Sequence, residues 1–100
     1  MRCLWVDDLC DQINAVMTAQ QQADLDASCT TDGGSPAVGT CPTTGAVAGH
    51  CLYTGEVVTL WTGVAIPGAT LIDFHYSAAG WTSGIAEIWC GSYPEGTWVP

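Results

Sequence analysis

Apolar residues near the start of the chain recur at the spacing of an α-helix. Intervals of three and four residues separate Cys3, Val6, Cys10, Ile13 and Met17. This spacing places side chains along one face of a helix, and no glycine or proline interrupts residues 1–32. The pattern therefore predicts a long amphipathic helix over residues 3–28, within an N-terminal segment 1–28.

After this segment the pattern changes from helical to extended. Residues 29–45 are rich in turn-forming residues and are expected to form a loop. Beyond it, runs of apolar and β-branched residues predict three antiparallel strands joined as a meander. These strands are expected at residues 46–53, 57–66 and 69–77.

The last quarter of the chain predicts two shorter elements. Residues 84–90 follow a serine suited to capping a helix and are expected to form a short helix. Residues 97–99 are expected to add a short last strand. The whole chain, residues 1–100, then forms a single α+β domain. In this prediction one long helix packs on a small antiparallel sheet, and residues 46–100 form the β-rich part.

Six cysteines in a chain of 100 residues change this picture most. None of them forms a Cys-x-x-Cys pair, the spacing typical of zinc and thiol-redox sites. An even, dispersed set favours three disulfides and an oxidising, extracellular or cell-surface location, with buried free thiols or a metal site as the alternative. The expected disulfide cysteines are Cys3, Cys10, Cys29, Cys41, Cys51 and Cys90.

The predicted helix restricts how these cysteines can pair. Cys3 and Cys10 would lie two helical turns apart, at about 10 Å, whereas the Cα atoms of a disulfide lie within about 7 Å. They are therefore expected to bond other cysteines and to attach the helix to the rest of the chain at two points. The remaining connectivity stays open.

The charge balance excludes several partners. The net charge is −9 and the only basic side chain of the Lys and Arg type is Arg2. Nucleic acid and anionic membranes are excluded as partners, because nothing replaces the counterions of their phosphates. No apolar stretch reaches the ~18 residues of a membrane span, and the apolar run after Met1 is too short for a signal peptide. An exported chain of this kind is expected to be a mature or trimmed form.

Only 11% of the residues are charged, whereas a soluble monomer usually has roughly 25–35% on its surface. Either uncharged polar residues cover the outside, or part of the outside is buried in an assembly. We expect a homo-oligomer or filament on the second interpretation.

Candidate catalytic residues are few. Asp73, His75 and Ser77 share one face of a predicted strand. A hydrolase of the Ser-His-Asp type needs its nucleophile on a sharp turn beside an oxyanion hole, and no Gly-x-Ser-x-Gly motif is present. These residues are interpreted as a polar stripe on an exposed sheet face. The protein is expected not to be an enzyme and to need no cofactor.

One short acidic motif resembles the start of a calcium loop. Asp24-x-Asp26 begins like an EF-hand loop, but positions 6 and 12 are Cys29 and Ser35 instead of Gly and Glu. A looser calcium site that includes Asp32 is the alternative, and no metal site is expected.

Five tryptophans are many for a chain of this length. Trp5 and Trp89 occupy helical positions and are interpreted as core residues. Trp61, Trp81 and Trp98 are the candidates for a surface that binds a ligand or a protein, because exposed aromatic rings stack on sugars and are enriched at interfaces.

The second half of the chain carries a recurring pattern of cysteines and glycines. It reads Cys41-Pro42, Gly45, Val47, Gly49, Cys51, then aromatic strands, Ala86…Cys90 and Gly96-Thr97-Trp98. This pattern resembles small cysteine-rich exported or lipoprotein-like domains of Gram-negative bacteria, with Ala48 as an insertion relative to it. The resemblance covers residues 41–98 and implies an exported disulfide domain without assigned catalytic residues.

Two functions follow as expectations. The first is a non-enzymatic extracellular structural protein that self-assembles as a subunit of a surface fibre or layer. The second is a secreted module that binds glycan or protein through Trp61, Trp81 and His75.

Overall fold

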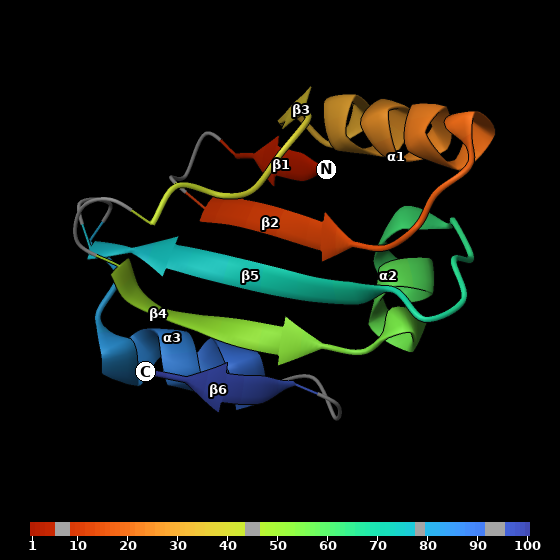
Figure 1. Ribbon diagram of the computed structural model, residues 1–100. Coiled ribbons are helices and arrows are strands. Elements are labelled where there is room, and N and C mark those ends of the chain that lie inside the picture. Colours follow the sequence, from red (N-terminus) through yellow and green to blue (C-terminus); the bar gives the residue numbers. More distant parts are fainter. Residues whose placement is uncertain (6–8, 44–46, 78–79, 92–95) are drawn as a thin grey trace.

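The computed structural model describes residues 1–5, 9–43, 47–77, 80–91 and 96–100. Six strands and three helices are described, in an α+β arrangement (Figure 1). The strands are Arg2–Leu4 (β1), Leu9–Asn14 (β2), Ser35–Ala37 (β3), Val47–Tyr53 (β4), Thr70–Tyr76 (β5) and Thr97–Val99 (β6). The helices are Ala19–Thr31 (α1), Gly55–Thr62 (α2) and Ser83–Gly91 (α3).

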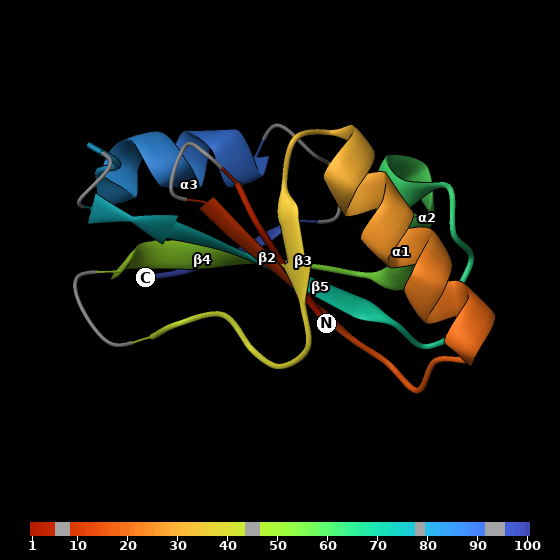
Figure 2. The same cartoon turned by 90° about the horizontal axis from the view of Figure 1, so that it is seen from above.

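The six strands form one sheet in the order β3-β1-β2-β5-β4-β6. Each described pair of neighbours is antiparallel. The three helices cover one face of this sheet, and the connection from β3 towards β4 passes across the other face (Figure 2). The sheet therefore has a helix-covered face and an open face.

The prediction of a long N-terminal helix is wrong. Strands β1 and β2 pair there instead, and the helix begins only at Ala19. Along β2, Leu9, Asp11 and Ile13 point to one face and Cys10 to the other, as the alternation of a strand requires. Residues 6–8, which the predicted helix included, lie outside the described residues.

The predicted three-strand meander is also wrong. The strands expected at 46–53 and 69–77 correspond to β4 and β5, but helix α2 replaces the strand expected at 57–66. This helix buries Val58 completely. It ends at Thr62. The next residue, Gly63, has a positive φ of 72° and donates its N–H to the Thr59 carbonyl, which caps the helix.

Helix α1 has a well-formed start but little apolar surface. Thr18 accepts a hydrogen bond from the Gln21 backbone N–H, and the Gln21 side chain accepts one from the Thr18 N–H, which together make a capping box. Leu25 and Cys29 are its buried residues. Burial of so few side chains contributes only about 1.5–3 kcal/mol for each large one, so the helix needs another attachment.

Three disulfides supply such attachments. Cys3–Cys29 joins β1 to α1, Cys51–Cys90 joins β4 to α3, and Cys10–Cys41 holds the connection across the open face. Cys3 and Cys10 thus belong to different disulfides, as expected, but not for the reason given by the helix. They lie on opposite faces of a strand pair, since Cys3 is opposite Asp11 and Cys10 is opposite Leu4.

Each face of the sheet has its own apolar cluster. The larger cluster lies between the sheet and the helices and includes Leu25, Val58 and Leu71, which are almost completely buried. The smaller cluster lies on the open face, around Phe74 and the Cys10–Cys41 disulfide.

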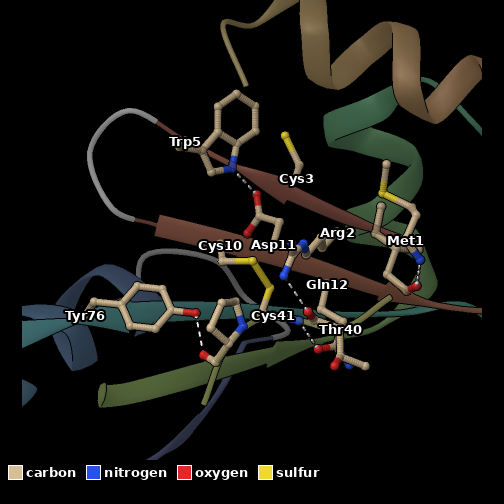
Figure 3. Close-up of a disulfide and its surroundings, with 12 residues drawn as sticks. Met1, Arg2, Cys3, Trp5, Cys10, Asp11, Gln12, Thr40, Cys41 and Tyr76 are labelled. Carbon is tan, nitrogen blue, oxygen red and sulfur yellow. Dashed lines mark hydrogen bonds between the residues drawn. A yellow bond between two sulfur atoms is a disulfide. The ribbon is translucent and has the colours of Figure 1, made fainter. Parts of the chain in front are cut away.

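Side chains hold the connection against the open face, in addition to the disulfide (Figure 3). The guanidinium of Arg2 donates to the Thr40 carbonyl at 3.1 Å. The Tyr76 hydroxyl donates to the Pro42 carbonyl at 2.7 Å. The only Arg of the chain is therefore engaged on the face opposite the helices.

None of the described helices is long and apolar enough to cross a membrane.

The disulfides predict a clear stability effect. Replacing both cysteines of Cys51–Cys90, 39 residues apart, is expected to cost about 4 kcal/mol in the free energy of unfolding, since the unfolded chain loses a loop constraint. Denaturant unfolding followed by circular dichroism measures this loss. The double alanine variant at Cys10–Cys41, 31 residues apart, is the matched control.

The control variant is expected to lose a similar free energy but to keep the tryptophan near-ultraviolet signal, because its disulfide lies on the open face. Equal stability of the parent and the Cys51–Cys90 variant would contradict the prediction.

Candidate functional site

A row of residues crosses the helix-covered face of the sheet at one level. In the strand register, Cys3 is opposite Asp11, Asp11 is opposite Asp73, Asp73 is opposite Cys51, and Cys51 is opposite Trp98. Directly opposed residues on neighbouring strands point to the same side. The two aspartates therefore lie side by side, between the disulfide that holds α1 and the disulfide that holds α3.

Asp11 is held by one indole and meets a second carboxyl. The Trp5 Nε1–H donates to Asp11 Oδ2 at 2.8 Å (Figure 3). Asp11 Oδ1 is buried and accepts no hydrogen bond from a side chain or backbone donor of the described residues. Burial raises the pKa of Asp11 well above its usual range, the charge of Asp73 and a hydrogen bond to it raise it further, and the Trp5 hydrogen bond opposes them. This favours the form in which Asp11 keeps a proton and donates it to Asp73.

His75 lies beside this pair on the same face of β5. Its side chain is 3% exposed, and its Nε2 lies 3.0 Å from Asp73 Oδ2. That contact is close enough for an ion pair if His75 is protonated, although its angle does not meet hydrogen-bond geometry. Within the described part of the chain, Nδ1 has no hydrogen-bond partner. The interpretation of Asp73 and His75 as an exposed polar stripe is therefore wrong, since the helices cover this face.

A cleft of about 430 Å³ opens above these polar residues. Its volume falls within the roughly 300–1,000 Å³ of small-molecule sites. A second hollow of about 300 Å³ adjoins it, and Asp11 and Asp32 line both. The aromatic lining of the larger cleft consists of Trp5, Tyr53, Trp61, Trp81 and Trp89.

The aromatic rings of the lining form two contacting groups. In one group the Trp81 ring lies 4.5 Å from His75 and 6.3 Å from Trp89, in edge-to-face arrangements. In the other, Tyr53 and Trp61 lie 5.0 Å apart, also edge to face. Such contacts hold the rings in defined orientations, so the walls keep their shape without a ligand.

Of the three tryptophans predicted for a binding surface, two line the cleft and one does not. Trp61 and Trp81 line the cleft. Trp98 does not; its ring covers Gly49, whose φ of 149° and lack of a side chain allow that close approach. The interpretation of Trp5 and Trp89 as core residues is wrong, because both line the cleft and Trp89 is 56% exposed.

The charge of the cleft is negative. Among the described residues, its lining contains three carboxyls, those of Asp11, Asp32 and Asp73, and one basic side chain, that of His75. Arg2 is engaged on the opposite face, with Thr40. The site therefore presents hydrogen-bond acceptors and negative charge beneath aromatic walls.

The acidic residues do not form a metal centre in the described structure. No group of three His, Cys, Asp or Glu side chains in the described ranges is placed to hold a metal ion. Asp24 and Asp26, the start of the calcium-like motif, lie on α1 and accept hydrogen bonds from Gln20 and Gln22.

No family model matches the chain, and no curated protein or solved structure is significantly similar to it. The resemblance to Gram-negative exported domains thus stays an expectation. The three disulfides, however, indicate an oxidising environment.

The buried acid predicts how stability depends on pH. A carboxyl whose pKa is raised by folding stabilises the fold below its unfolded pKa, near 3.8, and this contribution is lost as pH rises through the raised pKa. Asp11→Asn removes that loss and keeps an oxygen for Trp5. Thermal unfolding at pH 4–8 is expected to show a higher melting temperature at pH 7 than the parent, by about 4–8 °C for each kcal/mol gained.

Glu56→Gln is the control for this variant, since it removes one carboxylate from an exposed helix start. It is expected to keep the pH dependence of the parent. An unchanged pH dependence in Asp11→Asn would contradict the role assigned to the Asp11–Asp73 pair.

Proposed function

We propose that this protein is a non-catalytic extracellular module that binds a small ligand in the cleft between α1 and α3. The observation that carries this proposal is the arrangement of four tryptophans around a buried polar floor. Sites of this type combine mostly aromatic walls with a few convergent polar groups. The proposal therefore favours the binding module over the structural protein among the two expected functions.

The energetics of the floor support a binding role. Placing two carboxyls next to each other under helices costs stability, because burial and like charge both oppose ionisation. Perturbed groups of this kind cluster at functional sites more often than elsewhere. Replacing buried charged pairs with apolar residues is often neutral or stabilising in proteins, so the acids are best explained by what they bind.

The exposed wall supports the same proposal. Trp89 is 56% exposed although it borders the cleft. A large aromatic side chain in this position leaves apolar surface in water until a ligand covers it.

Self-assembly into a fibre or layer stays a prediction and has weaker support. The edge strands β3 and β6 have three residues each. Short edge strands are a common protection against edge-to-edge pairing, so they offer little surface for a fibre built through the sheet.

Ligand binding can be tested through the tryptophans themselves. Intrinsic fluorescence of the oxidised protein would be titrated with three ligand classes: aromatic amines, neutral oligosaccharides and aromatic carboxylates. At least one class is expected to give a saturable change. Trp89→Ala is expected to weaken that binding about fivefold, since an aromatic contact contributes on the order of 1 kcal/mol beyond buried area.

Ile88→Ala is the matched control, because Ile88 is an exposed neighbour on the same helix and lies outside the cleft lining. It is expected to bind like the parent. Absence of saturable binding in all three classes, or equal binding by Trp89→Ala, would overturn the proposed function.

A further inference from the structure

The floor of the cleft holds buried polar atoms that have no hydrogen-bond partner among the described residues. These atoms are both ring nitrogens of His75 and Oδ1 of Asp11. Nε2 of His75 lies 3.0 Å from Asp73 Oδ2 without hydrogen-bond geometry, so the fold itself satisfies neither ring nitrogen. Buried polar atoms without partners destabilise the fold, so a bound group that forms hydrogen bonds with them would recover this free energy.

The charge of the cleft restricts that group further. Asp73 is 14% exposed at the floor, beside Asp11, and Asp32 at the end of α1 lines the same cleft. The guanidinium of Arg2 points to the opposite face and cannot neutralise them. A donor that also carries positive charge therefore fits better than a neutral hydroxyl, and an anion fits worst.

We propose that the cleft binds a primary organic ammonium ion, with its nitrogen against Asp73, Asp11 and His75 and its apolar or aromatic body between the tryptophan rings. This inference rests on the proposed function and names the ligand class of the same site. An ammonium group has three donors and no acceptor, so it can bond to the Asp73 carboxylate and to the unpartnered atoms of Asp11 and His75.

The walls suit the body of such a ligand. Trp81 and Trp89 border the cleft on the side of α3, and Trp61 with Tyr53 borders it on the side of α2. A cation within about 6 Å of an indole face is attracted by the ring quadrupole, more strongly when it is shielded from water. The same rings bury the carbon atoms that follow the nitrogen.

A neutral sugar is the main competing ligand. Its hydroxyl groups carry no charge, and because they both donate and accept they would place further acceptors beside the Asp73 carboxylate. An aromatic carboxylate would be repelled by Asp32 and Asp73. Both classes are among the ligands of the fluorescence titration proposed above.

The test measures the affinity of the oxidised full chain for closely matched probes by titration calorimetry. 2-Phenylethylammonium is expected to bind at least tenfold more tightly than 2-phenylethanol, its neutral counterpart of nearly equal shape, because only the former offers charge and three donors. Its N,N,N-trimethyl derivative keeps the charge and loses the donors, and is expected to bind more weakly than 2-phenylethylammonium. Equal affinity of the ammonium ion and the alcohol would overturn the inference.

Variants test whether the charge of Asp73 contributes to binding of the ammonium ion. Asp73→Asn is expected to weaken binding of 2-phenylethylammonium about tenfold and to change binding of 2-phenylethanol less than twofold. Glu56→Gln removes the same charge from an exposed position on α2 and is expected to change neither. Equal losses in Asp73→Asn and Glu56→Gln would overturn the inference, since they would indicate attraction by net charge alone.

The failure of this inference can be told from the failure of the proposed function. Tight binding of an oligosaccharide without binding of the ammonium ion would overturn the ligand class and leave the binding module. Absence of binding for the amines, sugars and carboxylates alike would overturn both.

Discussion

Two disulfides hold the helices α1 and α3 against one face of the sheet, and the cleft between them depends on these bonds. Helix α1 buries Leu25 and Cys29 and otherwise presents polar residues. Apolar packing alone would fix such a helix weakly. The Cys3–Cys29 bond places its end beside β1, and the Cys51–Cys90 bond does the same for α3 beside β4. What remains between the two attachments is the space above β2 and β5.

The floor of this space follows from strand register. Because opposed residues share a face, the pairing of β2 with β5 brings Asp11 against Asp73. Only a shift of the whole strand would separate the two carboxyls. The raised pKa of Asp11 is thus a consequence of topology, and the Trp5 indole partly offsets its cost. The floor is rigid because Asp11, Asp73 and His75 lie on strands. The aromatic walls come from the end of β4, from α2 and α3, and from the residues that follow β1 and precede α3.

The C-terminal half of this fold could be predicted from the sequence better than the N-terminal half. Strands β4 and β5 lie in the segments where strands were expected, and α3 covers the expected short helix. The expected capping serine, Ser83, is instead the first residue of α3, and the Thr82 hydroxyl accepts from the Ile85 N–H. The N-terminal prediction failed because Cys3, Cys10 and Ile13 happen to have helical spacing, while their burial is decided by partners far away in the chain. Such tertiary override of local pattern is the usual limit of sequence reasoning. Helix α2 was missed because its β-branched residues are equally typical of a buried strand.

Only part of the site could be predicted, because local pattern shows single residues and not their partners on other strands. The sequence singled out Asp73 with His75, and Trp61 with Trp81, because each residue type was conspicuous by itself. Asp11 was missed, since a helical reading places it among solvent-exposed acids. Only its position between Leu9 and Ile13, read as strand alternation, would have marked it as an inward-facing carboxyl. Pairing across strands, which brings it to Asp73, is not encoded locally.

Cys3 and Cys10 also determine which face of the β1–β2 pair lies under the helices. Cys3 faces α1 and Cys10 faces the opposite connection, where Cys41 lies. A slip of one residue between β1 and β2 would place both thiols on one face and send Asp11 to the other. The Cys10–Cys41 bond could then not form beside the Cys3–Cys29 bond. Oxidation during folding therefore selects the register that puts the acid under the tryptophans, so bond formation acts as a check on strand alignment as well as a source of stability.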